Sequence, residues 1–239
     1  MRQNIIVFTG AGISKESGLS TFRENEGIWS KYDPDIVATP QGFEAYTEVA
    51  LDFYNELRSA IAEAEPNHAH IVLAMLEKIH NVTIITQNID DLHERAGSTN
   101  VLHLHGDIRK VTSSKNRLDE NCVKEMALTI PIKLGDCAAD GSQLRPYVVM
   151  FDEYLSNMTE ATKLVKEADI FVIIGTSLKV FPANQLVNAA HKEVPRYLID
   201  PGVFNNLPEG YVHIKQPATI GVDIFLNSIS GSSRIYGAF

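Results

Sequence analysis

A glycine-rich turn near the start of the chain has the residue types that bind a dinucleotide phosphate. Gly10, Ala11 and Gly12 follow the short apolar run Asn4–Phe8, and Ser14 stands where a helix could begin. Glycines let the backbone approach a pyrophosphate, and a helix N-terminus adds N–H donors and partial positive charge. The next glycine comes too late to complete the dinucleotide fingerprint. The turn alone is therefore compatible with cofactor binding and with a tight structural turn.

Two later apolar runs also end in polar residues. Val82–Thr86 is followed by Gln87, Asn88, Ile89 and Asp90, and Ile170–Ile174 is followed by Gly175, Thr176 and Ser177. Ligands bind at the carboxyl ends of strands in open parallel sheets, so three such ends predict one shared crevice. Asn88 and Asp90 could bind a carboxamide or a ribose, whereas Ser14 and Ser177 could bind phosphate or ribose hydroxyls.

A histidine beside a glycine turn is a candidate general base. His105 follows the strand-like run Val101–Leu104 and precedes Gly106. Imidazole titrates near neutral pH, so a histidine at a strand end can exchange a proton with a substrate. A purely structural histidine remains the alternative. His103 lies two residues earlier and shares a face with His105 if the strand continues that far.

Other catalytic patterns are absent from the sequence. The chain has no G-x-S-x-G nucleophile turn and no G-x-x-x-x-G-K-[ST] phosphate loop, which argues against serine hydrolases and P-loop enzymes. His68 and His70 lie near Glu63 and Glu65 but not at H-E-x-x-H spacing, and a helix start at this point explains them. We therefore predict no metal site there.

Alternating strand-like and helix-like segments predict an α/β fold with a doubly wound parallel, Rossmann-like sheet. The predicted helices cover residues 43–62, 67–79, 91–96, 157–168, 181–191 and 221–229. Residues 31–66 and 109–144 interrupt this rhythm and would form a second, smaller domain. The larger, dinucleotide-binding domain would comprise residues 1–30, 67–108 and 145–239. The single tryptophan, Trp29, lies in a long loop and would belong either to a lid that closes on something apolar or to a plain packing contact.

The composition is that of a globular protein in a reducing compartment. The chain has 239 residues, 44% of them hydrophobic, two cysteines and a formal net charge of −9. The negative charge argues against nucleic-acid binding, and no apolar run approaches the roughly 20 residues that span a bilayer. The N-terminal residues enter the first strand directly, which leaves no room for a signal peptide. We expect a cytoplasmic protein without nucleic-acid or membrane partners. The sequence does not indicate whether the protein is a monomer or an oligomer.

With these motifs in order, the chain resembles the sirtuins, the NAD-dependent protein lysine deacylases, over nearly its full length. The matching segments are Thr9–Gly18 with Phe22-Arg23, Thr86–His93 with Ala96-Gly97, His105-Gly106, Leu144–Phe151, Gly175–Leu178 and Val180–Ala183. The resemblance implies NAD as the cofactor and acyl-lysine proteins as substrates. The products would be nicotinamide, deacylated lysine and O-acyl-ADP-ribose.

The resemblance also implies roles for individual residues. Asn88 and Asp90 would hold the nicotinamide carboxamide, and His105 would act as base toward the ribose hydroxyls, so His105 and Asn88 would be the catalytic residues. The cofactor would contact Gly10, Ala11, Gly12, Ser14, Phe22, Arg23, Gln87, Asn88, Ile89, Asp90, Gly175, Thr176, Ser177, Asp200 and Ala218. A substrate peptide would add as a strand and contact Tyr54, Val148, Phe151, Val180 and Phe181.

The chain departs from the usual sirtuin pattern in its small domain. Most sirtuins carry two Cys-x-x-Cys pairs that bind a structural zinc, and the corresponding positions here hold Ser113, Asn116, Cys137 and Asp140. Tetrahedral zinc needs four ligands, and Cys122 does not restore the spacing. We therefore predict no zinc, a small domain held by apolar packing, and chemistry that does not depend on the metal.

A second departure concerns the acyl group. Sirtuins that prefer acidic acyl groups have Tyr and Arg three residues apart on the small-domain helix. Tyr54 is present, but Leu57 stands at the arginine position, and Arg58 comes one residue later, which turns it about 100° around the helix. We therefore favour acetyl or longer apolar acyl groups. An ADP-ribosyltransferase or an NAD hydrolase on the same fold remains the alternative function.

Overall fold

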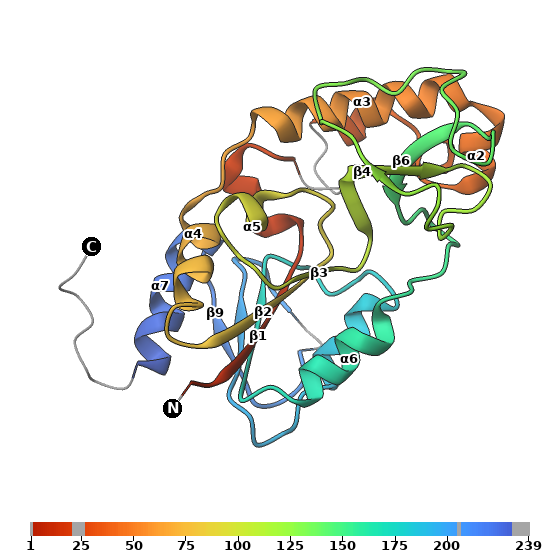
Figure 1. Ribbon diagram of the computed structural model, residues 1–239. Helices are drawn as coiled ribbons and strands as arrows, with labels where there is room; N and C mark the ends of the chain where they lie inside the picture. Colours follow the sequence, from red (N-terminus) through yellow and green to blue (C-terminus); the bar gives the residue numbers. More distant parts are fainter. Residues whose placement is uncertain (1, 21–26, 205–206, 231–239) are drawn as a thin grey trace.

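The computed structural model describes residues 2–20, 27–204 and 207–230, which form a larger part around a parallel sheet and a smaller part beside it (Figure 1). The sheet has six strands in the order β3-β2-β1-β7-β8-β9. Their bounds are β1 Asn4–Thr9, β2 Asn81–Thr86, β3 Val101–His103, β7 Ile170–Ile174, β8 Arg196–Ile199 and β9 Tyr211–Ile214. Every neighbouring pair is parallel. The doubly wound α/β fold is therefore confirmed.

Helices cover both faces of this sheet. They are α4 His68–Leu76, α5 Leu92–Arg95, α6 Met158–Lys166, α7 Ala218–Ile229 and the 3-10 helix η4 Ala183–Asn188. Successive residues of a strand point to opposite faces, so Ile5 and Val7 pack with α4 and α7, whereas Ile6 and Phe8 pack with α6 and η4. Figure 1 shows α4 and α7 on one side of the sheet and α6 on the other. Burial on both faces explains why the strand sequences are continuously apolar.

The smaller part combines a short antiparallel sheet with three helices. Its strands pair in the order β5-β4-β6, and its elements are β4 Gly106–Ser113, β5 Lys124–Glu125, β6 Leu144–Val148, α1 Pro34–Val37, α2 Pro40–Ala45, α3 Thr47–Glu63 and the 3-10 helix η3 Ile28–Lys31. Phe53 of α3 packs against Trp29 with ring centroids 4.6 Å apart. Trp29 is therefore a packing residue of this part. Both interrupting stretches contribute to the same apolar cluster, and the limits of the two domains remain a prediction.

Two polar side chains of α3 bind segments of the antiparallel sheet and its loop. Arg58 is fully buried and donates to the carbonyl oxygens of Ile108, at 2.6 Å, and Ala127, at 2.7 Å. Asn55 donates to the carbonyl oxygen of Ile132 and accepts the N–H of the same residue, both at 2.9 Å. Polar contacts therefore join α3 to the rest of the small part, in addition to the apolar packing that the sequence predicted.

The four positions expected at a zinc site do not form one. Ser113 Oγ donates to Asp140 Oδ2 at 2.7 Å, and Ser142 Oγ donates to Asp140 Oδ1 at 2.7 Å. Cys137 is exposed, and its Sγ lies 3.3 Å from the carbonyl oxygen of Gly135. Within the described residues, no group of three or more His, Cys, Asp or Glu side chains is arranged to hold a metal ion. These side chains do not fit tetrahedral zinc, and the absence of zinc from the protein remains a prediction.

Several elements differ from the sequence prediction. The glycine turn is followed by two 3-10 turns, η1 (Ala11–Ile13) and η2 (Lys15–Ser17), in place of an α-helix. The helix expected over 43–62 breaks at Tyr46, which leaves helical geometry and is 55% exposed. The helix expected over 181–191 is reduced to η4. Strand β9 was not predicted because it is short and only its last residue is buried. No helix of the described ranges is long and apolar enough to cross a bilayer.

Candidate active site

The ends of β1, β2 and β7 meet at one edge of the sheet, as the sequence predicted. Gly12 N donates to the carbonyl oxygen of Gly175 at 2.8 Å. Thr176 Oγ1 donates to Gln87 Oε1 at 2.7 Å, which joins the end of β7 to the end of β2. A Cβ atom on Gly12 would lie 2.7 Å from the Gly175 oxygen, so this approach of two backbones requires glycine. The glycine turn after β1 therefore packs directly against the backbone at the end of β7, and it is also a candidate cofactor site.

Ser14, Asn88 and Asp90 form a chain of hydrogen bonds at this edge. Asn88 Nδ2 donates to Ser14 Oγ, and Ser14 Oγ donates to Asp90 Oδ2, each at 3.0 Å. All three residues are buried. Burial raises the pKa of Asp90, and hydrogen bonds from Leu92 N and Ser14 oppose this rise. Ser14 therefore bonds to Asp90 with its hydroxyl and caps no helix, contrary to the expectation from the sequence.

His105 lies between β3 and β4, next to these residues. Its Nδ1 is 2.7 Å from the carbonyl oxygen of Gln87, and because a carbonyl oxygen only accepts, Nδ1 carries the proton. Nε2 is then the nitrogen that can take up a proton, and no hydrogen bond from the described residues reaches it. Burial lowers the pKa of His105, and the bond to Gln87 opposes this only in part. The imidazole is therefore neutral at pH 7 and has the protonation state of a base.

A charged network beside the site was not predicted. His103 Nδ1 lies 2.9 Å from the carbonyl oxygen of Asn88, and His103 Nε2 lies 2.9 Å from Glu94 Oε1. Arg109 Nη2 donates to Glu94 Oε1 and to Asp107 Oδ2, both at 2.8 Å. Burial lowers the pKa of His103, but the hydrogen bond and charge of Glu94 and the bond to Asn88 raise it, and the net shift is upward. The two-residue spacing of the histidines was the only signal of this network in the sequence.

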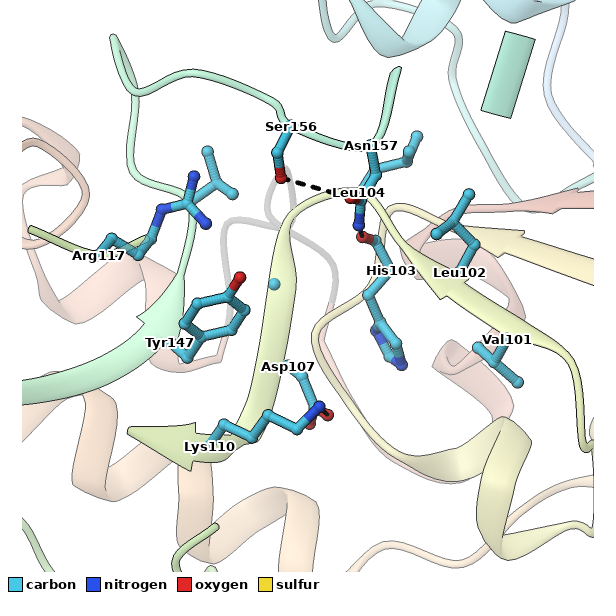
Figure 2. A pocket seen from close by; sticks show the side chains of 12 residues that line it. Val101, Leu102, His103, Leu104, Asp107, Lys110, Arg117, Tyr147, Ser156 and Asn157 are labelled. Carbon is cyan, nitrogen blue, oxygen red and sulfur yellow. Dashed lines mark hydrogen bonds and ion pairs between the residues drawn. The ribbon is translucent and has the colours of Figure 1, made fainter. Parts of the chain in front are cut away.

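A cavity of about 220 Å³ lies between β3, β4, β6 and the segment before α6 (Figure 2). Its lining residues are Val101, Leu102, His103, Leu104, Gly106, Asp107, Lys110, Arg117, Tyr147, Val149, Ser156 and Asn157. Lys110 Nζ lies 3.3 Å from Asp107 Oδ2, and Arg117 Nη2 donates to the carbonyl oxygen of Tyr154 at 2.7 Å. Two of its cationic side chains thus already bond to protein oxygens. The candidate base does not line this cavity, which is distinct from the edge where the strand ends meet.

The profile of the Sir2 family matches residues 10–182, a range that contains all three strand ends and His105. The chain belongs to the Sir2 family. It is 45% identical over 223 residues to an NAD-dependent protein deacylase of Bacteroides thetaiotaomicron, covering 92% of this chain and 95% of that protein. An NAD-dependent protein deacylase of Helicobacter pylori is 47% identical over 217 residues, covering 90% and 93%. The resemblance inferred from the motifs is thereby confirmed.

Solved structures of Sir2 homologues share the fold of this Sir2 protein. A Sir2 homologue in complex with NAD has a TM-score of 0.83 at 34% identity, covering 95% of this chain and 89% of that chain. A mutant Sir2 homologue in complex with ADP-ribose also has a TM-score of 0.83, at 33% identity, covering 97% and 95%. These similarities agree with the parallel sheet and the smaller inserted part described above.

The other residues expected to bind the cofactor differ in exposure. Ala11 and Ser177 are exposed, whereas Ala218 is buried at the start of α7. Ile89 packs against the apolar cluster of the small part. Asp200 follows β8, and burial raises its pKa although its carboxylate accepts a hydrogen bond from a nearby backbone N–H. Two more expected residues lie outside the described part of the chain: Phe22 and Arg23.

The residues expected to bind substrate do not form one cluster. Val148 is buried in β6, and the N–H of the residue after it donates to the carbonyl oxygen of His105 at 2.8 Å. Tyr54 is buried in the small part, and burial raises the pKa of its hydroxyl. The remaining three residues are exposed, namely Phe151, Val180 and Phe181. Among the described substrate residues, only the β6 segment reaches the candidate base through a hydrogen bond.

Proposed function

We propose that this protein removes acyl groups from protein lysines with His105 as the general base and Asn88 as the residue that holds the nicotinamide carboxamide of NAD. Membership of the Sir2 family, with relatives at 45% and 47% identity, makes the chain an NAD-dependent protein deacylase. The observation that carries the residue assignment is the hydrogen bond from His105 Nδ1 to Gln87, which leaves Nε2 available for a proton.

The side chains at the strand ends fit NAD. An amide on Asn88, a hydroxyl on Ser14 and a carboxylate on Asp90 bond to one another at 3.0 Å, and a carboxamide or a ribose needs this mixture of donors and acceptors. NAD, when bound, supplies the ADP-ribose that accepts the acyl group and releases nicotinamide. The burial of these three residues excludes water from their hydrogen bonds, which strengthens them.

His105 would remove a proton from a ribose hydroxyl during acyl transfer. A neutral imidazole whose pKa is lowered by burial stays in its basic form throughout the neutral range. The backbone carbonyl oxygen of His105 accepts a hydrogen bond from the N–H that follows β6. The strand beside which a substrate peptide would add is therefore hydrogen-bonded to the backbone of the base. We expect O-acyl-ADP-ribose as the product of this step.

The acyl group accepted would be neutral. Arg58 is buried and bonds to backbone carbonyl oxygens, so it is not available to pair with an acidic acyl chain. Leu57 packs against the apolar cluster of the small part, and Tyr54 is buried in that cluster. The cation that acts on Tyr54 is Arg145, and Arg145 already pairs with Glu153. An acyl carboxylate placed among these side chains would therefore lack an unpaired cation, which is costly in a buried site. Acetyl and longer apolar acyl groups therefore fit better than succinyl.

Mass spectrometry of the purified protein with NAD tests this function. Two peptides of one sequence, one with acetyl-lysine and one with succinyl-lysine, are incubated with the wild type, with His105→Ala and with His68→Ala. His68 forms an exposed pair with Asp223 and serves as the matched control. We expect NAD-dependent loss of the acetyl group and formation of O-acetyl-ADP-ribose, at a rate lowered at least about 100-fold in His105→Ala, which is the range of a general base.

Other outcomes would contradict parts of the proposal. Faster loss of succinyl than of acetyl would refute the acyl preference. Nicotinamide release without acyl loss would favour an NAD hydrolase, and a gain of ADP-ribose mass on protein would favour an ADP-ribosyltransferase. A His105→Ala protein that retains the wild-type rate would remove His105 from the role of base.

A further inference from the structure

Two histidines of the β3–β4 segment make the same type of contact with two successive residues of the turn after β2. His103 Nδ1 lies 2.9 Å from the carbonyl oxygen of Asn88, and His105 Nδ1 lies 2.7 Å from the carbonyl oxygen of Gln87. Both partners are backbone carbonyl oxygens, which only accept, so both Nδ1 atoms carry protons and donate. The turn that presents Asn88 thus accepts hydrogen bonds from two imidazoles.

The two histidines differ at the other ring nitrogen. His103 Nε2 lies 2.9 Å from Glu94 Oε1, and the side chains of this pair are only 10% and 21% exposed. Burial raises the pKa of Glu94, but the hydrogen bond and charge of His103 and the charge of Arg109 lower it, and the net shift is downward. Glu94 is therefore a carboxylate, and His103 Nε2 donates to it. His103 is therefore an imidazolium with both N–H groups occupied, which leaves it no free nitrogen for proton transfer.

The contact with His103 falls on Asn88, the residue proposed to hold the nicotinamide carboxamide. The N–H of Asn88 bonds to Thr86 Oγ1 at 3.0 Å, its carbonyl oxygen bonds to His103, and its side-chain amide bonds to Ser14 Oγ at 3.0 Å. Arg109 bonds to Glu94 at 2.8 Å and so fixes the carboxylate that orients the His103 ring. All polar groups of the Asn88 backbone are thereby held in one conformation.

We propose that His103 is a positioning residue for the reaction, which sets the orientation of the Asn88 amide through the hydrogen bond from its Nδ1 to the Asn88 carbonyl oxygen, with Glu94 holding the ring. This inference rests on the proposed function, because it takes Asn88 as the residue that binds the nicotinamide carboxamide. His103 does not touch the reacting atoms. Its loss should affect NAD binding and turnover and leave peptide binding unchanged.

Two substitutions separate the two ring nitrogens. The amide nitrogen of asparagine occupies the place of Nδ1 of histidine, and that of glutamine occupies the place of Nε2. His103→Asn therefore keeps the hydrogen bond to the Asn88 carbonyl oxygen and loses the one to Glu94. His103→Gln keeps the hydrogen bond to Glu94 and loses the one to Asn88. We expect His103→Gln to raise the KM for NAD about tenfold, the effect of one lost hydrogen bond from a charged donor. We expect His103→Asn to raise it no more than about threefold.

Steady-state kinetics on an acetyl-lysine peptide tests the proposal. KM for NAD, KM for the peptide and inhibition by added nicotinamide are measured for both variants, with His68→Asn and His68→Gln as controls at an exposed histidine–carboxylate pair. The expected result is a raised KM for NAD and weaker nicotinamide inhibition in His103→Gln, with the KM for the peptide within twofold. Equal losses in the two variants that follow their melting temperatures would refute positioning and leave His103 a purely structural role.

A measurement on the wild type keeps the inference testable if the variants do not fold. NMR of protein labelled with ¹⁵N in its histidine rings should show His103 protonated at both nitrogens and His105 protonated at Nδ1 alone at pH 7. An unprotonated Nδ1 at His103 would overturn the inference. The two hypotheses fail differently, because a wild type without NAD-dependent deacylation refutes the proposed function, whereas an active wild type with equally active His103→Gln refutes only the role of His103.

Discussion

Replacement of Arg58 by methionine should destabilise the protein without changing which acyl group it prefers. Arg58 Nη1 lies 2.6 Å from the carbonyl oxygen of Ile108, and Nη2 lies 2.7 Å from that of Ala127 and 3.2 Å from that of Met126. A hydrogen bond from a charged donor contributes about 1.5–3 kcal/mol, so the two short bonds contribute about 3–6 kcal/mol. Burial of the guanidinium, which lowers the pKa of Arg58, opposes part of this.

We therefore expect Arg58→Met to lower the free energy of unfolding by about 3 kcal/mol, since four carbonyl oxygens, including that of Ile130, lose a partner inside the small part. For a chain of this size that corresponds to a fall in melting temperature of about 6–12 °C. Urea unfolding followed by fluorescence and calorimetry measures both quantities. Arg2→Met is the matched control, because Arg2 also donates to a carbonyl oxygen, at 3.0 Å, but is exposed.

The kinetic part of this experiment tests the position of the side chain. Activities on acetyl-lysine and succinyl-lysine peptides should change by the same factor in Arg58→Met, because the guanidinium bonds to backbone carbonyl oxygens and is not available to pair with an acyl carboxylate. A melting temperature within 1 °C of the wild type would refute the assignment of Arg58 to the small-part loop. A selective loss of succinyl activity would place Arg58 at the acyl group, against the contacts described here.

Three further predictions concern the metal, the base and the small-part hydrogen bonds. Overnight dialysis against a chelator should leave the melting temperature and activity unchanged, and elemental analysis should find less than about 0.1 zinc per chain, since tetrahedral zinc needs four ligands; a stoichiometric metal would contradict this. Because burial lowers the pKa of His105 and its neutral form is the base, kcat/KM should rise with pH to a plateau, with the midpoint below the ordinary histidine value of about 6.5; a midpoint above 7 would contradict the assignment. Hydrogen bonds from Ser113 and Ser142 lower the pKa of Asp140 to about 2. The ionised carboxylate therefore stabilises the folded protein fully at pH values above the pKa of Asp140 in the unfolded chain, and this stabilisation is lost as the pH falls toward the folded pKa. Asp140→Asn should therefore melt below the wild type at pH 7, and this difference should disappear between about pH 4 and pH 2; a difference independent of pH would argue against the hydrogen-bonded carboxylate.

The sheet was predictable because each of its central strands is buried on both faces. Ile170–Ile174 and Val82–Thr86 are continuously apolar or β-branched, and both form strands of the parallel sheet. The segment after the glycine turn was mispredicted for a physical reason. Ser14 has the side chain of a helix N-cap, but its hydroxyl bonds to Asp90, which is distant in sequence, and one 3-10 turn precedes it while another follows. Local propensity could not show that competing partner.

The candidate site was predictable in its residues but not in their partners. Polar types at strand ends indicated Asn88, Asp90 and His105, because topology brings such ends together. The other histidine of the pair, His103 of β3, gained significance only from Glu94, which lies on the helix α5. The helical angle between Leu57 and Arg58 predicts that the arginine points away from the position expected for an acyl partner, but it could not show that the side chain bonds to carbonyl oxygens of the small part. Helical periodicity predicts the direction of a side chain from the helix axis, whereas its hydrogen-bond partners depend on the tertiary fold.

The hydrogen bonds at the expected zinc positions are too weak to replace a metal by themselves. Ser113 Oγ accepts the N–H groups of Lys115 and Asn116 at 3.0 and 3.1 Å and donates to Asp140, so it joins the two segments that zinc joins in most sirtuins. The two bonds that Ser113 Oγ accepts from backbone N–H groups are neutral and contribute about 1 kcal/mol each, whereas a structural zinc contributes about 10 kcal/mol or more. The Asp140 carboxylate that accepts the bond from Ser113 is exposed, and solvent screens this bond. A small part without metal therefore needs stronger contacts elsewhere, and the bonds of the buried Arg58 to backbone carbonyl oxygens are contacts of this kind. This is why Arg58→Met should lower stability more than Asp140→Asn, and the reverse order would mean that the serine–aspartate cluster, rather than α3, holds the small part together.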